Sequence, residues 1–247
     1  MTGKTRHRMK RFQKSLLENI LWIVAVVVVC CGLLAFGSCA SMKDSGMSHE
    51  NGVVEWELGR INDALPPGVM RLGTPRTIDS PAGKAVEFDG KGDALFFDSD
   101  PLLNLRAFTV EVLLRPDADA PAEQRYLHMG EENGERIMLE TRVTPENQWY
   151  LDAYCRSGDS SKALIDKSLL HPTGNWYHVA FVVDNGLMRT YVDGAFELEG
   201  HVPFTPFTRG SSSIGVRMNR RYWFKGAMGT IRITPRSLAP SEFAQWR

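Results

Sequence analysis

Short apolar runs with alternating polarity recur along the chain from Val53 onward, and Gly, Pro, Asn and Asp separate them. Examples are FTVEVLLRP at 108–116, RIMLETRV at 136–143 and WYHVAFVVD at 176–184. A period of two is typical of strands that bury one face. Many short strands joined by turn residues form antiparallel sandwiches or jelly rolls. The pattern therefore predicts an all-β domain, an antiparallel β-sandwich, over residues 53–247.

One predicted hairpin stands out, NWYHVAFVVDNGLMRTYVDG at 175–194. Its turn, DNG at 184–186, supplies residues that tolerate the positive φ angles of tight hairpins. Both faces of the strand pair carry apolar side chains, which favours a central position in a sheet rather than a solvent-exposed edge. We expect Trp176 and His178 to be framework groups, packed where the two sheets meet.

The start of the chain has a different pattern. Six basic side chains precede ILWIVAVVVVCCGLLAF at 20–36, an uncharged run, and the small residues GSCAS follow it. This order is that of a secretory signal, while the run is also close to the ~20 residues that span a bilayer. We expect a signal peptide or membrane anchor over 1–39, both alternatives staying open. The small, polar residues 40–52 predict a flexible tether.

Cysteine placement refines this prediction. The segment Phe36-Gly37-Ser38-Cys39 resembles a bacterial lipobox, in which the cysteine carries lipid, although Ser38-Cys39-Ala40 also fits an ordinary cleavage site. With Cys39 lipidated, Cys155 has no partner for a disulfide in the exported domain. Cys155 then reads as a small buried apolar residue rather than a nucleophile. The expected location is extracytoplasmic, in the cell envelope, with the protein anchored to a membrane.

Charge excludes one class of partner. The formal net charge is zero, but the residues after position 38 carry 23 basic and 28 acidic side chains. Nucleic-acid binding needs clustered basic charge. We therefore expect no nucleic-acid partner.

Three blocks in order carry a family resemblance. They are AVEFDGKGDALFFDSDPLLNLRAFTVEVLLRPD at 85–117, the hairpin at 175–194, and YWFKGAMGTIRITPRSLAPSEF at 222–243. Together they resemble the LamG-like (laminin G-like) jelly-roll family of the concanavalin A-like lectin/glucanase superfamily, over roughly 50–247. The resemblance implies two packed antiparallel sheets, one of them concave. Family members include carbohydrate binders, adhesion modules, calcium-dependent ligand binders and glycoside hydrolases, and the fold alone does not choose among them.

Catalytic carboxylates are not evident from spacing. Retaining hydrolases of the superfamily place acids at E-x-D-x-x-E on one strand, and this chain has no such motif. Glu140 shares a strand face with Arg136 and Arg142, which predicts an exposed charge ladder, or alternatively a polar strip that binds sugar. The sequence favours a protein without catalysis, with a glycoside hydrolase or polysaccharide lyase as the alternative.

The resemblance also raises the question of calcium. Family members often bind it near an FDG-x-x-D turn, to which Asp89 and Asp93 correspond. Gly229 and Thr230 stand where the family has a further Asp and Glu, which removes oxygen ligands that a hard cation needs. We therefore expect no cofactor, and keep calcium at Asp89 and Asp93 as the alternative.

The best candidate for ligand contact is VRMNRRYWF at 216–224. Its candidate residues are Arg217, Asn219, Arg220, Arg221, Tyr222 and Trp223. Guanidinium and amide groups offer planar hydrogen bonding, and the aromatic rings offer apolar faces for sugars. In the alternative interpretation, Trp223 and Phe224 are core anchors and the arginines are simply solvated. The chain is thus predicted to be a membrane-anchored recognition module for a polysaccharide or a surface protein, or else a structural domain of the envelope.

Overall fold

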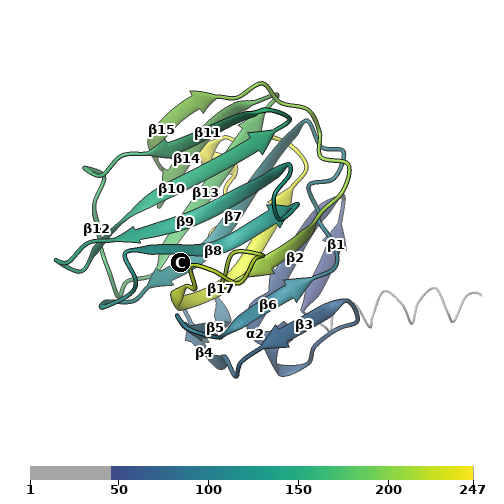
Figure 1. Ribbon diagram of the computed structural model, residues 1–247. Coiled ribbons are helices and arrows are strands. Elements are labelled where there is room, and N and C mark those ends of the chain that lie inside the picture. Colours follow the sequence, from purple (N-terminus) through teal and green to yellow (C-terminus); the bar gives the residue numbers. More distant parts are fainter. Residues whose placement is uncertain (1–45, 247) are drawn as a thin grey trace, which may run out of the picture. The chain divides into compact units, whose positions relative to one another are not determined.

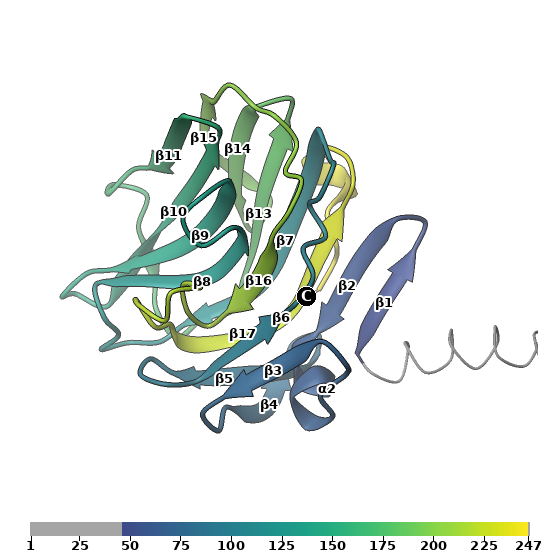
Figure 2. The same cartoon turned by 45° about the vertical axis from the view of Figure 1, so that its right-hand side comes forward.

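A computed structural model of the chain describes residues 46–246. Two antiparallel sheets pack face to face (Figures 1 and 2). The prediction of an all-β antiparallel sandwich is confirmed. The predicted signal or anchor segment, Cys39 included, lies outside the described residues. Between residues 46 and 246, no helix is long and apolar enough to cross a bilayer.

The first layer is a nine-stranded sheet. Its strands are β1 (Met47–Glu50), β2 (Val53–Glu57), β4 (Arg76–Ser80), β5 (Gly83–Asp89), β7 (Ala107–Pro116), β13 (Tyr177–Asp184), β14 (Leu187–Val192), β15 (Ala195–His201) and β17 (Lys225–Thr234). The order is β1-β2-β17-β7-β13-β14-β15, and β17 also pairs with β5, which pairs with β4. A short helix, α2 (Leu58–Asp63), follows β2.

The second layer is an eight-stranded sheet. Its strands are β3 (Val69–Leu72), β6 (Ala94–Phe97), β8 (Glu123–Gly130), β9 (Arg136–Val143), β10 (Gln148–Ser157), β11 (Ser160–Ile165), β12 (His171–Pro172) and β16 (Ser211–Ile214). The order is β11-β10-β9-β8-β16-β6-β3, with β12 also paired to β10.

Alternate side chains of both sheets fill one hydrophobic core. Trp56 of β2 stacks on Phe97 of β6 across the sandwich, with ring centroids 4.2 Å apart. Trp56 is fully buried and Phe97 nearly so. Truncating an aromatic side chain in such a core costs about 3–5 kcal/mol of stability. This rigid interior fixes the positions of the side chains that point outward.

The predicted hairpin is present as β13 and β14. Asp184 pairs with Leu187 across the turn, and Asn185 and Gly186 have φ angles of 48° and 92°, as a type I′ turn requires. The hairpin lies between β7 and β15, which confirms the predicted central place.

The expected position of Trp176 and His178 is wrong. Tyr177 and Val179 face the core. Because side chains alternate along a strand, His178 lies on the side of the nine-stranded sheet that points away from the core. Trp176 is half-buried beside Arg115, whose Cζ lies 5.6 Å from the ring centroid.

Within the predicted tether, β1 occupies Met47–Glu50 and pairs with β2. Met47 also packs against the hydrophobic core.

The outer face of the eight-stranded sheet

Strand alternation turns one set of β9 and β10 side chains away from the core. On β9 these are Arg136, Met138, Glu140 and Arg142, and on β10 they are Tyr150, Asp152, Tyr154 and Arg156. The two strands pair in register, so each outward side chain of β9 lies beside one of β10. The result is a polar and aromatic surface on one face of the sandwich, which we call the outer face.

A network of carboxylates and guanidinium groups lies on this outer face. Glu140 contacts Arg125 Nε through Oε1 at 3.1 Å and Arg142 Nη2 through Oε2 at 3.0 Å. The same Arg142 nitrogen lies 2.7 Å from Asp152 Oδ2, and Arg142 Nη1 lies 3.0 Å from Glu123 Oε2. Arg125 also pairs with Glu123. Three carboxylates thus share two guanidinium groups, which leaves one negative charge when all are ionised.

Glu140 is the most buried member, with 2% of its surface exposed. Burial, reinforced by the neighbouring charge of Asp152, raises the pKa of Glu140 to about 7, although Arg125 and Arg142 oppose the shift. The predicted charge ladder around Glu140 therefore exists, but the expectation that it is exposed is wrong. Arg125, on the preceding strand β8, lies against it.

A second group of arginines lies at the other end of β9 and β10. Arg136 and Arg156 are cross-strand partners. Arg136 Cζ lies 5.2 Å from the centroid of the Tyr154 ring, within the range of a cation–π contact. Arg217, from the loop after β16, reaches the same end and donates from Nη2 to the Glu132 carbonyl oxygen at 3.5 Å.

The loop at 216–224 runs beside β8. Arg125 N donates to the Tyr222 carbonyl oxygen at 2.9 Å, and Arg217 N donates to the Arg221 carbonyl oxygen at 3.2 Å. Tyr222 lies over Arg125, with 3.8 Å between its ring centroid and the guanidinium carbon. Arg220 lies 5.9 Å from the ring centroid of Phe96, on β6.

The structure thus brings three of the six predicted loop residues to the outer face, namely Arg217, Arg220 and Tyr222. Arg221 is exposed, and Asn219 is half-buried with its Oδ1 unpartnered among the described residues. Trp223 is half-buried beside the fully buried Phe224. Only Phe224 therefore matches the alternative interpretation of a core anchor.

A pocket of about 410 Å³ continues the outer face at the β3 and β6 end. Its lining residues are Gly68, Val69, Met70, Phe96, Phe97, Asp98 and Ser211. Met70 is 46% exposed. The pocket supplies apolar surface next to Arg220.

Asp89 and Asp93, the candidate calcium ligands, lie at a pocket of about 540 Å³ that Lys225 also lines. Asp89 Oδ1 accepts from the backbone N–H groups of Lys91, Gly92 and Asp93 at 2.8, 2.9 and 3.1 Å. Asp93 Oδ1 accepts from Thr74 N at 2.8 Å. These carboxylate oxygens thus already accept hydrogen bonds from backbone N–H groups. Among residues 46–246, no group of three His, Cys, Asp or Glu side chains is placed to hold a metal ion.

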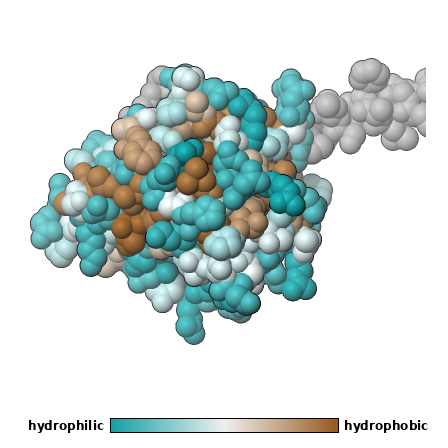
Figure 3. Space-filling model, turned by 90° about the horizontal axis from the view of Figure 1, so that it is seen from above, coloured by the Kyte–Doolittle hydropathy of each residue, from teal (hydrophilic) through white to brown (hydrophobic). Residues whose placement is uncertain are grey.

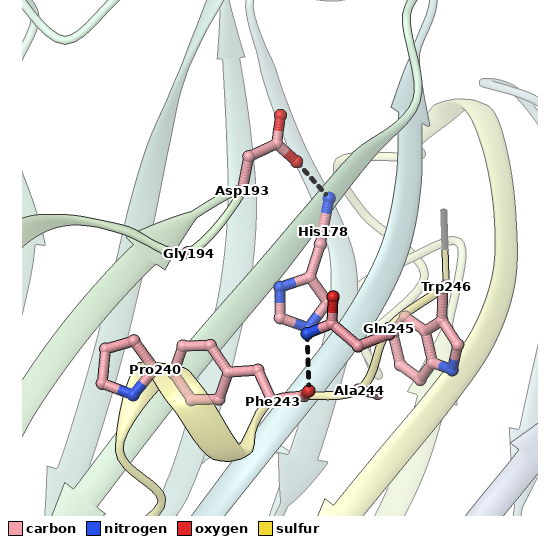
Figure 4. A pocket seen from close by; sticks show the side chains of 8 residues that line it. All are labelled: His178, Asp193, Gly194, Pro240, Phe243, Ala244, Gln245 and Trp246. Atoms are coloured by element: carbon pink, nitrogen blue, oxygen red, sulfur yellow. Dashed lines mark hydrogen bonds between the residues drawn. The ribbon is translucent and has the colours of Figure 1, made fainter.

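Another pocket, of about 230 Å³, lies on the nine-stranded sheet (Figure 4). Its lining residues are His178, Asp193, Gly194, Pro240, Phe243, Ala244, Gln245 and Trp246. His178 Nε2 and Glu111 Oε1 form a buried hydrogen bond of 2.9 Å, and Ala244 N donates to the same oxygen at 2.7 Å. Both groups therefore hold the C-terminal segment against the sheet, which is a structural role.

Apolar surface is also present at the end of the sandwich where β11 and β15 lie. Seen from above, hydrophobic areas alternate with hydrophilic ones (Figure 3). Phe196 of β15 and Ile165 of β11 are 57% and 40% exposed.

Sequence reasoning missed several residues of the outer face, namely Phe96, Arg125, Asp152, Tyr154 and Arg156. The alternation of WYLDAYC at 149–155 predicts a strand with outward Asp152 and Tyr154. It does not say which strand lies beside it.

Comparisons with known proteins agree with this architecture. Domain 4 of AbnA, a GH43 extracellular arabinanase from Geobacillus stearothermophilus solved in complex with arabinotriose, is 23% identical, with a TM-score of 0.50 over 69% of this chain and 79% of that domain. A SAP-like pentraxin from Limulus polyphemus is 16% identical, with a TM-score of 0.52 over 66% of this chain and 81% of the pentraxin. At these identities the likeness shows the fold alone.

The binding domain of botulinum neurotoxin serotype D is 15% identical, with a TM-score of 0.53 over 82% of this chain, and the match spans only 50% of that domain. No curated protein matches the chain. A laminin G family model, described as the concanavalin A-like lectin/glucanases superfamily, matches residues 89–244. The chain therefore belongs to the laminin G-like family of the concanavalin A-like lectin/glucanase superfamily.

Proposed function

We propose that this protein is a carbohydrate-recognition module of the cell envelope, and that the outer face of the eight-stranded sheet binds the glycan. One observation carries the proposal. Aromatic side chains and guanidinium groups lie next to one another on a single face of a rigid sheet. Tyr150 and Tyr154 are half-buried there, and Arg136 lies against the Tyr154 ring.

The chemistry of these groups suits sugars. An aromatic ring offers an apolar face to the C–H side of a sugar ring, and a guanidinium offers fixed hydrogen-bond donors to hydroxyl and carboxylate oxygens. The pocket beside Met70 and Phe96 extends the apolar surface. The arabinanase domain of the same fold, solved with arabinotriose, supports a sugar ligand for this chain.

A glycan array and pull-down with insoluble polysaccharides test the proposal, using the full-length chain in neutral detergent. Tyr150→Ala and Tyr154→Ala should each weaken binding by about tenfold, since stacking an aromatic ring contributes about 0.5–1.5 kcal/mol beyond its buried area. Phe196→Ala, an exposed aromatic on the other sheet, is the matched control. If the chain binds no glycan but captures a surface protein, or binds neither, the proposal gives way to the protein-binding or structural alternative.

The location is a further part of the proposal. We place the domain outside the cytoplasm, tethered by the N-terminal segment, with lipid on Cys39. The basic, apolar and small-residue order of residues 1–39 supports this. Mass spectrometry of the membrane fraction should find lipid on Cys39, and Cys39→Ser should remove it. An unmodified Cys39 in the exported protein contradicts the lipid anchor and leaves a retained transmembrane anchor or ordinary secretion.

Glycoside hydrolysis is the second candidate function. The observation that favours it is the cross-strand pair Glu140 and Asp152, because the raised pKa of Glu140 suits a general acid near neutral pH. Against it, guanidinium groups engage both carboxylates. Reducing-sugar release on a polysaccharide panel, with Glu140→Gln as the inactive control, decides between hydrolase and binder.

A further inference from the structure

We infer that Arg136, Arg156 and Arg217 form an anion-binding site on the outer face, and that it takes the carboxylate or sulfate groups of an acidic polysaccharide. This inference rests on the proposed function and names the class of glycan. The three residues come from β9, β10 and the loop after β16, so no single segment of sequence presents them together.

Within residues 46–246, the three guanidinium groups donate only to backbone carbonyl oxygens. Arg136 Nη1 donates to Gly134 O at 2.6 Å, Arg156 Nε to Gly158 O at 3.3 Å, and Arg217 Nη2 to a carbonyl oxygen at 3.5 Å. None of the three forms an ion pair with any residue between 46 and 246. Nine of the other thirteen arginines of that range pair with a carboxylate.

The burial of Arg136 is the central observation, because only 7% of the residue's surface is exposed. Its Nε is buried and has no hydrogen-bond partner among the described residues, and the same holds for Arg217 Nε. Burying a charge is costly unless it is paired. An anion beside the guanidinium group would offset the unpaired charge, so the site gains more from an acidic group than from a neutral hydroxyl.

Acidic side chains near the site are already engaged. Glu131 binds Arg209 at 3.0 Å, and the Glu135 carboxylate accepts from a backbone N–H at 3.3 Å. The Glu132 carboxylate accepts from its neighbour Asn133. Glu140 belongs to the network farther along β9. Among the described residues, none of these acids forms an ion pair with Arg136, Arg156 or Arg217.

His128 does not add to this charge. Burial, with a smaller effect from Arg136 and Arg217, lowers its pKa to about 4, although a hydrogen bond to the Glu131 carbonyl oxygen opposes the shift. His128 is consequently neutral at physiological pH. The positive field of the site comes from guanidinium groups, which stay charged at all physiological pH values.

Aromatic surface beside the arginines indicates a sugar polymer rather than a small free anion. Tyr154 lies directly beside Arg136, so one ligand can place a ring on the tyrosine while its acidic group meets the guanidinium. Arg220 repeats the combination with Phe96 on β6. A chain with an acidic group on successive sugars suits such repeated pairs of arginine and aromatic ring.

The test compares polymers that differ only in charge. Full-length protein in neutral detergent is titrated with polygalacturonate and with fully methyl-esterified polygalacturonate, and in a second arm with dextran sulfate and dextran. We expect at least tenfold tighter binding to the acidic member of one pair, weakening with added salt because screening reduces attraction between exposed charges. The arm that responds tells whether the site prefers carboxylate or sulfate.

Variants assign the binding to the site. Arg156→Gln and Arg217→Gln should each weaken acidic-polymer binding by about tenfold, the usual effect of losing one charged hydrogen bond. Arg106→Gln, an exposed arginine before β7 with the same change of charge, is the control and should bind like the parent. For the buried position, Arg136→Lys keeps the charge but loses the planar donors, and Arg136→Gln loses both, with melting temperature recorded for each.

The outcomes separate the two levels of the proposal. Equal binding to the acidic and neutral members, or binding to neutral glycans alone, overturns the anion site and leaves carbohydrate recognition standing. Acidic binding that falls as much for Arg106→Gln as for Arg156→Gln also overturns the site, because attraction is then a property of the whole surface. Binding to no polysaccharide, neutral or acidic, overturns both.

Discussion

Glu140 of β9 and Asp152 of β10 are cross-strand partners, and one nitrogen of Arg142 contacts a carboxylate oxygen of each, at 3.0 and 2.7 Å. Two acids side by side in a buried place repel each other, and the shared guanidinium offsets that repulsion. This carboxylate–guanidinium network is separate from Arg136, Arg156 and Arg217, which we propose bind the ligand.

Removing this shared cation should be costly. We expect Arg142→Met to lower the free energy of unfolding by about 3–5 kcal/mol at pH 8, because it leaves buried carboxylates without their partner. The matched control is Arg189→Met, since Arg189 pairs with Glu199 at 2.6 Å but both side chains are well exposed; an exposed pair contributes at most about 1 kcal/mol. Urea denaturation measures both, and equal small effects would contradict the role of Arg142.

The raised pKa of Glu140 predicts a pH dependence of stability. The folded chain holds the Glu140 proton up to a pKa of about 7, whereas an unfolded glutamate releases it near its ordinary pKa of 4.5. Between these values the folded state binds more protons, so the free energy of unfolding should fall as pH rises through this window. Glu140→Gln should remove that part of the dependence. Urea melts from pH 4 to 8 compare the two chains, and parallel profiles would show that Glu140 does not titrate there.

Loop arginines should affect binding without affecting stability. We expect Arg220→Ala with Arg221→Ala to weaken any glycan binding while the melting temperature stays nearly unchanged, because both side chains are exposed and such substitutions usually change stability by less than about 0.5 kcal/mol. Phe224→Ala in the same segment should instead destabilise the fold by about 3–5 kcal/mol, since its ring is fully buried. Unchanged glycan affinity in the double variant would remove these two arginines from the binding surface.

The Cys155 thiol should be unreactive toward alkylating reagents in the folded protein. Burial, with a small effect of Glu135, raises the pKa of its thiol to about 12, so the reactive thiolate is scarce at pH 8. Alkylation followed by mass spectrometry of the Cys155 peptide should find no modification in buffer and full modification in urea. Rapid labelling of the folded chain would show that the thiol is accessible after all.

Calcium should have little effect on stability. Backbone N–H groups already use oxygens of Asp89 and Asp93, and Lys225 brings a positive charge to the same pocket. We expect the melting temperature to be the same in millimolar calcium and in chelator, for the parent and for Asp89→Asn. A ligand that binds only the folded state raises its stability, so a clear rise with calcium that Asp89→Asn abolishes would establish a metal site.

Sequence periodicity predicted the sandwich and the β13–β14 hairpin because alternation and turn chemistry are local properties. His178 shows where this reasoning stops. Both faces of β13 are apolar, so the pattern does not tell which one meets the other sheet. The segment that covers His178 includes Phe243, which lies in a distant part of the chain.

The residues of the outer face were predictable only in part, for the same reason. The loop at 216–224 was recognisable by its composition, and Glu140 was seen to share a face with two arginines. Their environment depends on strand neighbours. Arg125 reaches Glu140 because β8 pairs with β9, and a bulge between Arg125 and Leu127 shifts the register of that pairing. Arg136 and Arg217, distant in sequence, meet only through the sheet and the loop after β16.

The position of β17 has a consequence for how the chain reaches its folded state. This strand, from the last part of the sequence, pairs with β2, β5 and β7. Until β17 has been synthesised, β2, β5 and β7 lack the strand that joins them in the middle of their sheet. Folding through such distant contacts is slow. An emerging chain thus cannot complete the nine-stranded sheet until nearly its whole length has been made.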